Sequence, residues 1–301
     1  MRDAEHSLGV FRVTSSSTLS GIMHGDDSGE VKLFGYKHEH GVGARSLHII
    51  VALSQCAALP ASLITRKNGN IQVVAPVSCN DTQSLHLLSQ SLMPQLVGHP
   101  NVASALLVAA GCEGVGARDF MPHSLSRNGA LEFIVDGESN RSSTTVLFGE
   151  AALSELSARS MPGFEYFTGS KVGILNGGTN HNLGAIQEQL NALGLEVVTR
   201  DVHGGIGPAL TELALAGCIV IVNFLGPQDI PTGFPIVPVL NVSSGSDLHN
   251  KVSELIDIPA QASTDEMVAE ITATLGRQAT KVELFGLNAF EPEQLMSGSS
   301  R

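Results

Sequence analysis

Residues 47–53 read LHIIVAL, an almost uninterrupted apolar run with the length of one β-strand. Three further runs of this kind follow, at residues 71–77 (IQVVAPV), 105–110 (ALLVAA) and 131–135 (LEFIV). Runs that are apolar throughout, rather than at alternate positions, are typical of strands buried on both faces of a parallel sheet. The first half of the chain is therefore expected to form a parallel sheet from these four strands.

Segments with helical periodicity separate these strands. One helix is expected over residues 83–97, where the preceding residues 80–82 (Asn-Asp-Thr) can cap its first turn. A second is expected over residues 145–158. Because strands and helices alternate, the sheet should carry helices on both faces.

The same alternation repeats in the second half of the chain. The expected strands are residues 172–175, 195–199, 219–224 and 236–242, and the expected helices are residues 183–193, 208–215, 247–256 and 265–275. We predict an α/β fold of two Rossmann-like, doubly wound lobes with mostly parallel sheets. The lobes are expected to span residues 31–160 and 161–290, with tails at residues 1–30 and 291–301.

Composition excludes several classes of function. The formal net charge is −12, Trp is absent and the basic residues are scattered, so no basic footprint for nucleic acid is visible. No stretch reaches the roughly 18 to 20 apolar residues of a membrane span. Residues 1–30 lack the apolar centre of a signal peptide. A cytoplasmic protein without nucleic-acid or membrane partners is expected.

The four cysteines carry the most informative chemistry. Cys218 lies inside an apolar run and is expected to be a small core residue. Cys56, Cys79 and Cys112 each follow a predicted strand, at the edge of an open α/β sheet where ligands bind. Three thiols on three strand ends could share a metal or an iron–sulfur cluster with one open position. Spacing alone also allows three independent cysteines, since free cysteines are often simply buried.

Several stretches of the chain occur together, in order, in one known family. Residues 34–46 read FGYKHEHGVGARS and residues 99–113 read HPNVASALLVAAGCE; residues 54–56 (SQC), 77–79 (VSC), 231–245 and 255–259 complete the set. These stretches resemble the motifs of the altronate/galactarate dehydratase family, and the HPN…GCE run is the most specific of them.

The resemblance implies an iron-linked lyase that eliminates water from a sugar acid, or sulfite from sulfolactate. It further implies that Cys56, Cys79 and Cys112 hold iron or a [4Fe-4S] cluster, and that a small domain or separate small subunit completes the enzyme. In such a β-elimination a base removes the proton next to a carboxylate, while a Lewis acid stabilises the developing negative charge.

Three further residues are candidates for catalysis. Arg45 suits two-pronged binding of a substrate carboxylate, with a structural ion pair as the alternative. His99 is a candidate base or ligand, and the alternative is a hydrogen bond that fixes a turn. Glu113 is a candidate acid or base, and the alternative is a helix cap.

The second half departs from the family at the predicted substrate-binding loop. Residues 176–180 (NGGTN) stand where the family has Cys-Gly-Gly-Ser-Asp, and residues 224–229 replace its Thr-Thr-Gly-Arg-Gly-Ser loop. Backbone amides in this Gly-rich turn could hold a carboxylate or phosphate, although a plain strand-to-helix turn is the alternative. The predicted substrate-binding residues are Arg45, Asn176, Gly177, Gly178, Thr179 and Asn180.

Together these features predict a hydro-lyase-type enzyme acting on a small hydroxy-carboxylic acid. It is expected to be a large subunit that works with a separate small subunit, in a homo-oligomer. One alternative is a hydrolase or transferase that uses a single cysteine nucleophile. The other is a non-catalytic binding subunit.

Overall fold

The computed structural model covers most of both predicted lobes. It describes residues 23–25, 31–68, 71–74, 78–81, 92–113, 130–134, 142–178, 181–203, 205–288 and 290. Both predicted tails, apart from residues 23–25, lie outside the described residues, as does most of the helix expected at residues 83–97. Thr179 and Asn180 of the predicted substrate loop also lie outside them.

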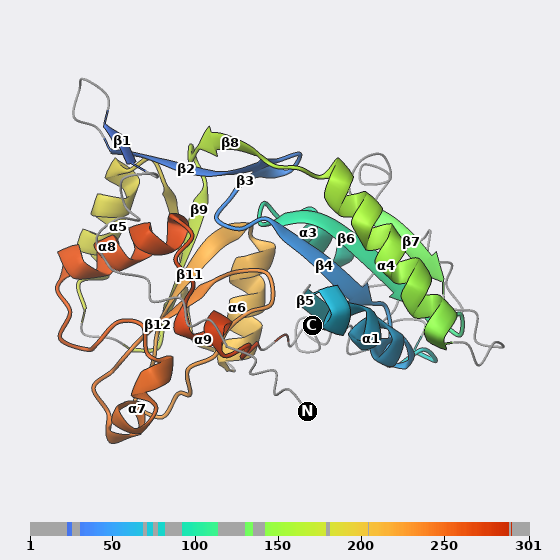
Figure 1. The fold of residues 1–301 in the computed structure, drawn as a ribbon. Helices are drawn as coiled ribbons and strands as arrows, with labels where there is room; N and C mark the ends of the chain where they lie inside the picture. The colour runs from blue at the N-terminus through green and yellow to red at the C-terminus, as the bar shows by residue number, and fades with distance from the viewer. Residues whose placement is uncertain are drawn as a thin grey trace, which may run out of the picture.

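The first half forms the predicted parallel sheet, in the order β5-β4-β6-β7 (Figure 1). Its strands are β4 (Leu47–Ala52), β5 (Ile71–Val74), β6 (Val102–Ala109) and β7 (Ala130–Ile134), and every neighbouring pair is parallel. The central strands β4 and β6 are almost wholly buried, as their continuous apolar sequences predict.

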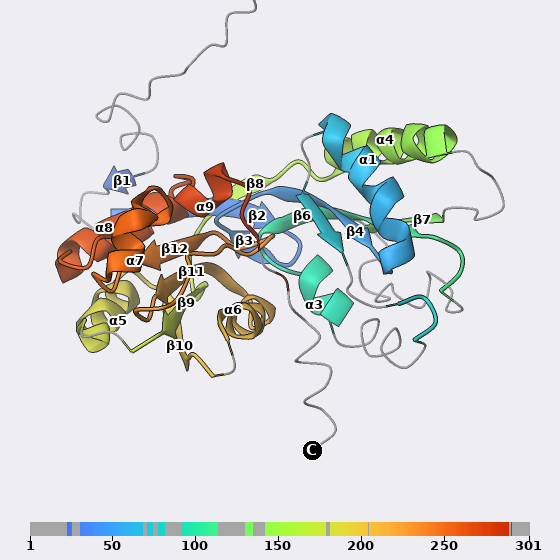
Figure 2. The ribbon, with the colours of Figure 1, turned by 90° about the horizontal axis from the view of Figure 1, so that it is seen from below.

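Helices cover both faces of this sheet (Figure 2). Because side chains alternate along a strand, Ile50 and Leu106 face α1 (Ala58–Asn68) and α4 (Ser142–Arg159), whereas Ile49 and Leu107 face the other side. That other side packs on α3 (Met93–Val97). The sequence reading anticipated α4 but not α1.

The second half forms another parallel sheet, in the order β10-β9-β11-β12. Its strands are β9 (Lys171–Asn176), β10 (Glu196–Asp201), β11 (Cys218–Phe224) and β12 (Val239–Val242). Apolar residues of α5 (Leu183–Ala192) and α8 (Thr264–Leu275) pack on one face, and those of α6 (Ile206–Leu215) on the other. The prediction of an α/β fold with two doubly wound parallel sheets is thus confirmed.

Three short helical segments complete the second half. They are α7 (Asp247–Lys251), the 3₁₀-helix η5 (Ser253–Leu255) and α9 (Lys281–Leu284). One apolar core joins the two sheets, since Leu107 of β6 and Leu210 of α6 belong to the same cluster. The division of the chain into lobes at residue 160 stays a prediction.

A third sheet, which is antiparallel, was not anticipated from the sequence. It consists of β1 (Met23–Gly25), β2 (Val31–His38), β3 (Gly41–Gly43) and β8 (Gly163–Tyr166). Cross-strand aromatic pairs join β2 to β8, and the guanidinium carbon of Arg277 lies 4.5 Å from the ring centre of Tyr36. This sheet therefore ties residues 31–43 to the segment that enters the second half and to the end of α8 (Figure 1).

Within the part of the chain that the structure describes, no helix combines the length and apolar character needed to cross a membrane.

Candidate metal centre

The cysteines lie at the carboxyl edge of the first sheet. In the order β5-β4-β6-β7, the connections that leave β4 and β6 run to opposite sides, and a ligand crevice is expected between the ends of such a pair of strands. Cys56 follows β4, within the 3₁₀-helix η2 (Gln55–Ala57) that leads into α1, and Cys112 follows β6. Cys79 follows β5 on the neighbouring side. The topology thus brings together residues that are far apart in sequence.

The three sulfur atoms form a compact group. All three Sγ atoms lie within 4.8 Å of one another, and those of Cys56 and Cys79 are 3.5 Å apart. Cys56 and Cys112 are exposed, and Cys79 is half-buried. The predicted clustering of these cysteines is therefore confirmed, and Cys218 is fully buried in the core, as expected.

Two of the three thiols, Cys56 and Cys112, have pKa values above the ordinary value of a cysteine. The hydrogen bond from the Cys56 thiol to the sulfur of Cys79 raises the pKa of Cys56 above its ordinary value. Desolvation, followed by hydrogen bonds with the other two thiols and the charge of Glu113, raises the pKa of Cys112 to about 12. At neutral pH these two groups are thiols, and a cation has to displace their protons in order to bind.

Glu113 directly follows Cys112 and is only 2% exposed. Its Oε1 accepts a hydrogen bond of 2.7 Å from the hydroxyl of Ser54 and one of 2.7 Å from the backbone N–H of Ala110. Ser54 is itself fully buried. Through this one oxygen, Glu113 connects the segments that follow the two central strands.

The donor set fits a soft metal. Thiolates are the preferred ligands of zinc, of copper(I) and of iron in iron–sulfur clusters. Among the described residues no histidine, aspartate or glutamate joins the three sulfurs within the same distance. Three protein sulfurs leave a coordination position for an exogenous ligand, which is the arrangement of a catalytic rather than a purely structural site.

Arg45 lies just before β4, at the opposite edge of the sheet from Cys56. Its guanidinium donates to both carboxylate oxygens of Glu283, at 2.9 Å each. The remaining N–H groups donate to the backbone carbonyls of Ala44, Thr274 and Gln278. All five donors are used within the chain, so the geometry matches the structural alternative and leaves none for a substrate carboxylate.

His99 lies just before β6, also at the amino edge, and is 2% exposed. Its Nδ1 accepts the backbone N–H of Asn101, so its Nε2 carries the proton that is donated to the carbonyl of Cys218. Burial lowers the pKa of His99 to about 4. The structure does not bring His99 to the cysteines but uses it to join β6 to the start of β11.

This burial predicts a pH dependence of stability. The pKa of His99 in the folded protein, about 4, lies below its ordinary 6.5. Between these two pH values His99 is therefore protonated in the unfolded chain and neutral in the folded protein. The contribution of His99 is therefore complete above pH 6.5 and declines by about 3 kcal/mol as the pH falls to 4. Urea unfolding of the wild type and of His99→Gln across this range measures it. A wild-type profile parallel to that of the variant would contradict the assignment.

The Gly-rich turn after β9 uses its own amides. The Gly177 N–H donates to the carbonyl of Phe224 at 2.8 Å, and the Gly178 N–H donates to Oδ1 of Asn176 at 3.1 Å. A Cβ at Gly177 would lie 2.4 Å from the Phe224 carbonyl oxygen, so close packing of strand ends requires glycine here. These two amides thus match the alternative of a strand-to-helix turn rather than an anion cradle.

Two residues with central positions escaped the sequence analysis. Ser54 links the cysteine site to Glu113, and Asn101 joins three parts of the chain at the amino edge. The HPN run contained Asn101, and Ser54 directly precedes the Gln55-Cys56 pair, so both stood beside residues that had been singled out.

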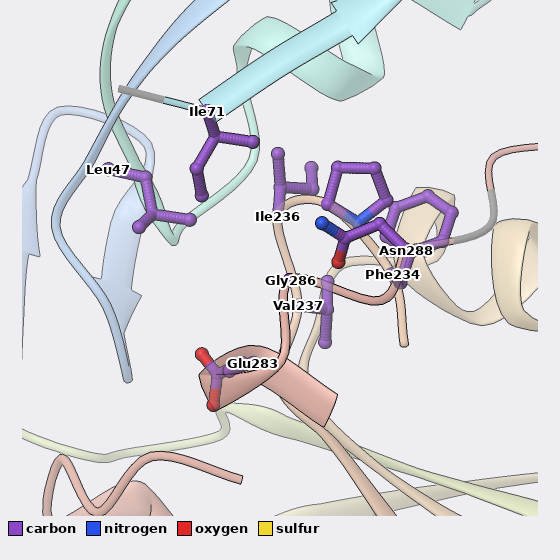
Figure 3. Close-up of a pocket in the computed structure, with 9 residues that line it drawn as sticks. Leu47, Ile71, Phe234, Ile236, Val237, Glu283, Gly286 and Asn288 are labelled. Carbon is purple, nitrogen blue, oxygen red and sulfur yellow. The ribbon is translucent and has the colours of Figure 1, made fainter. Parts of the chain in front are cut away.

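A cavity of about 480 Å³ opens at the amino edge of the first sheet. Leu47 and Ile71, the first residues of β4 and β5, lie on one side and Ile236 on the other, with Glu283 at the rim (Figure 3). The cysteines lie at the opposite, carboxyl edge of this sheet, which is the edge where ligands of open α/β sheets bind. The cavity is therefore separate from the cysteine site.

Three comparisons with known proteins bear on this site. Residues 35–159 match the family model described as D-galactarate dehydratase/altronate hydrolase, second domain. The search of curated proteins gives no match. Among solved structures, a C2-type ketoreductase from a modular polyketide synthase aligns over 88% of this chain and 90% of its own, with 11% identity and a TM-score of 0.20. The segment that the family model matches contains all three clustered cysteines.

Proposed function

Since residues 35–159 match the family model described as D-galactarate dehydratase/altronate hydrolase, second domain, we propose that the chain is a lyase with a metal on Cys56, Cys79 and Cys112. The reaction is a hydro-lyase-type β-elimination from a small hydroxy-carboxylic acid. One observation carries the proposal: three sulfurs within 4.8 Å of one another stand at the carboxyl edge of the family-matched sheet.

The cysteines hold the metal, and the crevice between the ends of β4 and β6 admits the substrate. Iron, alone or as a [4Fe-4S] cluster, would supply a Lewis acid at the remaining position, where it stabilises negative charge on a substrate oxygen. The exposed faces of Cys56 and Cys112 leave this position open to solvent and to a small acid. Arg45 and His99 contribute to this reaction by fixing the amino ends of β4 and β6.

Metal analysis of protein purified without oxygen tests the proposal. We expect iron, and sulfide if a cluster is present, together with a brown colour. Cys56→Ser, Cys79→Ser and Cys112→Ser should each lose most of the iron, because three sulfurs share it. Cys218→Ser is the matched control and should keep it, since Cys218 is buried in the core and is not part of the group of three sulfurs. Colourless, metal-free protein that eliminates water from hydroxy acids at full rate would contradict the metal site.

A second candidate is a hydrolase or transferase with Cys56 as its single nucleophile. The exposure of Cys56 and its place at the start of the η2–α1 helical segment favour it. The raised pKa of Cys56 opposes it, since the thiolate is the nucleophile. Loss of activity in Cys56→Ser alone, with Cys79→Ser and Cys112→Ser fully active, would select this function over the lyase.

The proposal includes a separate small subunit and self-association of the chain. Light scattering after size-exclusion chromatography gives the mass of the purified chain, and co-expression with a candidate small subunit tests for a joint complex. A monomer that reaches full lyase activity alone would contradict both parts.

A further inference from the structure

We propose that Glu113 is the positioning residue of the three-cysteine site, because its buried carboxylate ties the end of β4 to the end of β6. In doing so it sets the separation of the Cys56 and Cys112 sulfurs. The inference deepens the metal site proposed above and rests on it. It replaces the acid or base role expected for Glu113 from the sequence.

A single oxygen makes both connections. Oε1 of Glu113 lies 2.7 Å from the Ser54 hydroxyl oxygen and 2.7 Å from the Ala110 nitrogen. Ser54 precedes Cys56 by two residues, and Ala110 precedes Cys112 by two. Each cysteine is therefore separated from the same carboxylate by a very short piece of backbone.

The sheet does not hold the two chain segments together at this point. The parallel ladder between β4 and β6 ends at the pair of Ala52 and Val108, and one further bond runs from the Leu53 N–H to the Val108 carbonyl. Past Leu53 the segments diverge into η2 and into the turn that carries Cys112. The carboxylate of Glu113 connects them there.

Burial makes the two hydrogen bonds of Glu113 the main determinants of its position. Among the described residues no lysine, arginine or histidine forms an ion pair with Glu113. A buried carboxylate without a cation is costly, and two hydrogen bonds offset only part of that cost. The position of the carboxylate therefore depends on the Ser54 hydroxyl and the Ala110 N–H, the two groups that donate to it. Groups of this kind behind metal ligands commonly fix ligand geometry.

The first test uses Co²⁺ added to metal-free, reduced protein. The sulfur-to-cobalt charge-transfer band reports how many thiolates bind. Glu113→Gln keeps an oxygen that can accept both hydrogen bonds, so it should retain the wild-type band. Glu113→Ala should weaken Co²⁺ binding by about 10- to 100-fold and lower the band towards that of two sulfurs. Ser54→Ala removes one of the two bonds and should fall between them.

Ser104→Ala is the matched control for Ser54→Ala. Ser104 is buried on the same sheet, 2% exposed, but its hydroxyl contacts His48 near the amino edge. A general loosening of the sheet would affect Ser104→Ala and Ser54→Ala alike, whereas a positioning role affects Ser54→Ala alone. Should Glu113→Ala fail to fold, Ser54→Ala and Glu113→Gln still carry the comparison.

A second test needs no metal. In a Cys79→Ser background, phenylarsine oxide bridges Cys56 and Cys112 only if their sulfurs stay close. We expect bridging with Glu113 and with Glu113→Gln, and two separately reactive thiols with Glu113→Ala. Equal bridging, or equal Co²⁺ bands, in Glu113→Ala and wild type would overturn the inference. If the wild type binds no Co²⁺ and Glu113→Ala nevertheless abolishes bridging, the proposed metal function is overturned and the positioning role is supported.

Discussion

Metal uptake by Cys56, Cys79 and Cys112 is expected to strengthen by at least about 100-fold for each unit that the pH rises between 6 and 8. The pKa of Cys56 is raised above its ordinary value, and that of Cys112 is raised to about 12, so both are protonated throughout this range. Each must release a proton when it binds the metal. Each released proton contributes a factor of about ten per pH unit to the change in apparent affinity. Competition of metal-free protein with a coloured chelator for Zn²⁺ measures the slope.

The slope also tests which thiols are ligands. Cys112→Ser removes one ionising ligand and should lower the pH dependence by about tenfold per unit as well as weakening binding. Cys218→Ser should leave both unchanged, because the pKa of Cys218, which burial raises to about 12, belongs to a core residue outside the cluster. Binding that does not change between pH 6 and 8 would mean that the metal is held by groups other than these thiols.

Asn101→Ala is expected to lower the free energy of unfolding by about 4 kcal/mol or more. The Asn101 side chain is fully buried and makes four hydrogen bonds. It accepts the N–H groups of Ala44 and Arg45 and donates to the carbonyls of Ile219 and Ile236. Removing it leaves buried backbone groups without partners in three parts of the chain at once. Urea unfolding followed by far-UV circular dichroism measures the loss.

Asn223→Ala is the matched control for this prediction. Asn223 is equally buried, but its amide donates one hydrogen bond, to Asn241, and its Oδ1 has no partner among the described residues. The same loss of volume should therefore cost clearly less than at Asn101. Equal destabilisation by the two substitutions would show that packing volume, rather than the four hydrogen bonds, accounts for the effect.

Two of the motifs that carried the family resemblance meet at one place in the fold. Gly43 packs so closely on Pro100 that a Cβ there would lie 2.2 Å from the Pro100 carbonyl oxygen. Arg45 and Asn101 then join this contact to α8, α9 and the second sheet. The Gly-Val-Gly-Ala-Arg and His-Pro-Asn stretches thus form a structural junction at the amino edge. In a single sequence such a junction cannot be told from a catalytic motif, because both place polar residues and glycines beside strands.

The buried strands could be predicted from the sequence because the apolar pattern of each strand lies within its own residues. A strand such as β4 or β11, covered on both faces, needs an apolar side chain at nearly every position, and that pattern is visible in the residues themselves. The antiparallel sheet was missed because β2 and β3 contain glycines, histidines and charged residues, and are stabilised by partners distant in sequence such as β8. The helix α1 was missed as well, with Pro60 in its first turn.

By itself, the sequence determined the α/β class, the parallel strands and the positions of Cys56, Cys79 and Cys112 after strand ends, since these follow from hydrophobic periodicity and strand length. Only the tertiary structure decided that three of the ends converge, that Glu113 connects two of them, and that Arg45 and His99 belong to the opposite edge. The physical reason is strand order. The order β5-β4-β6 and the register of its pairs determine which ends become neighbours, and these depend on contacts between segments far apart in the chain.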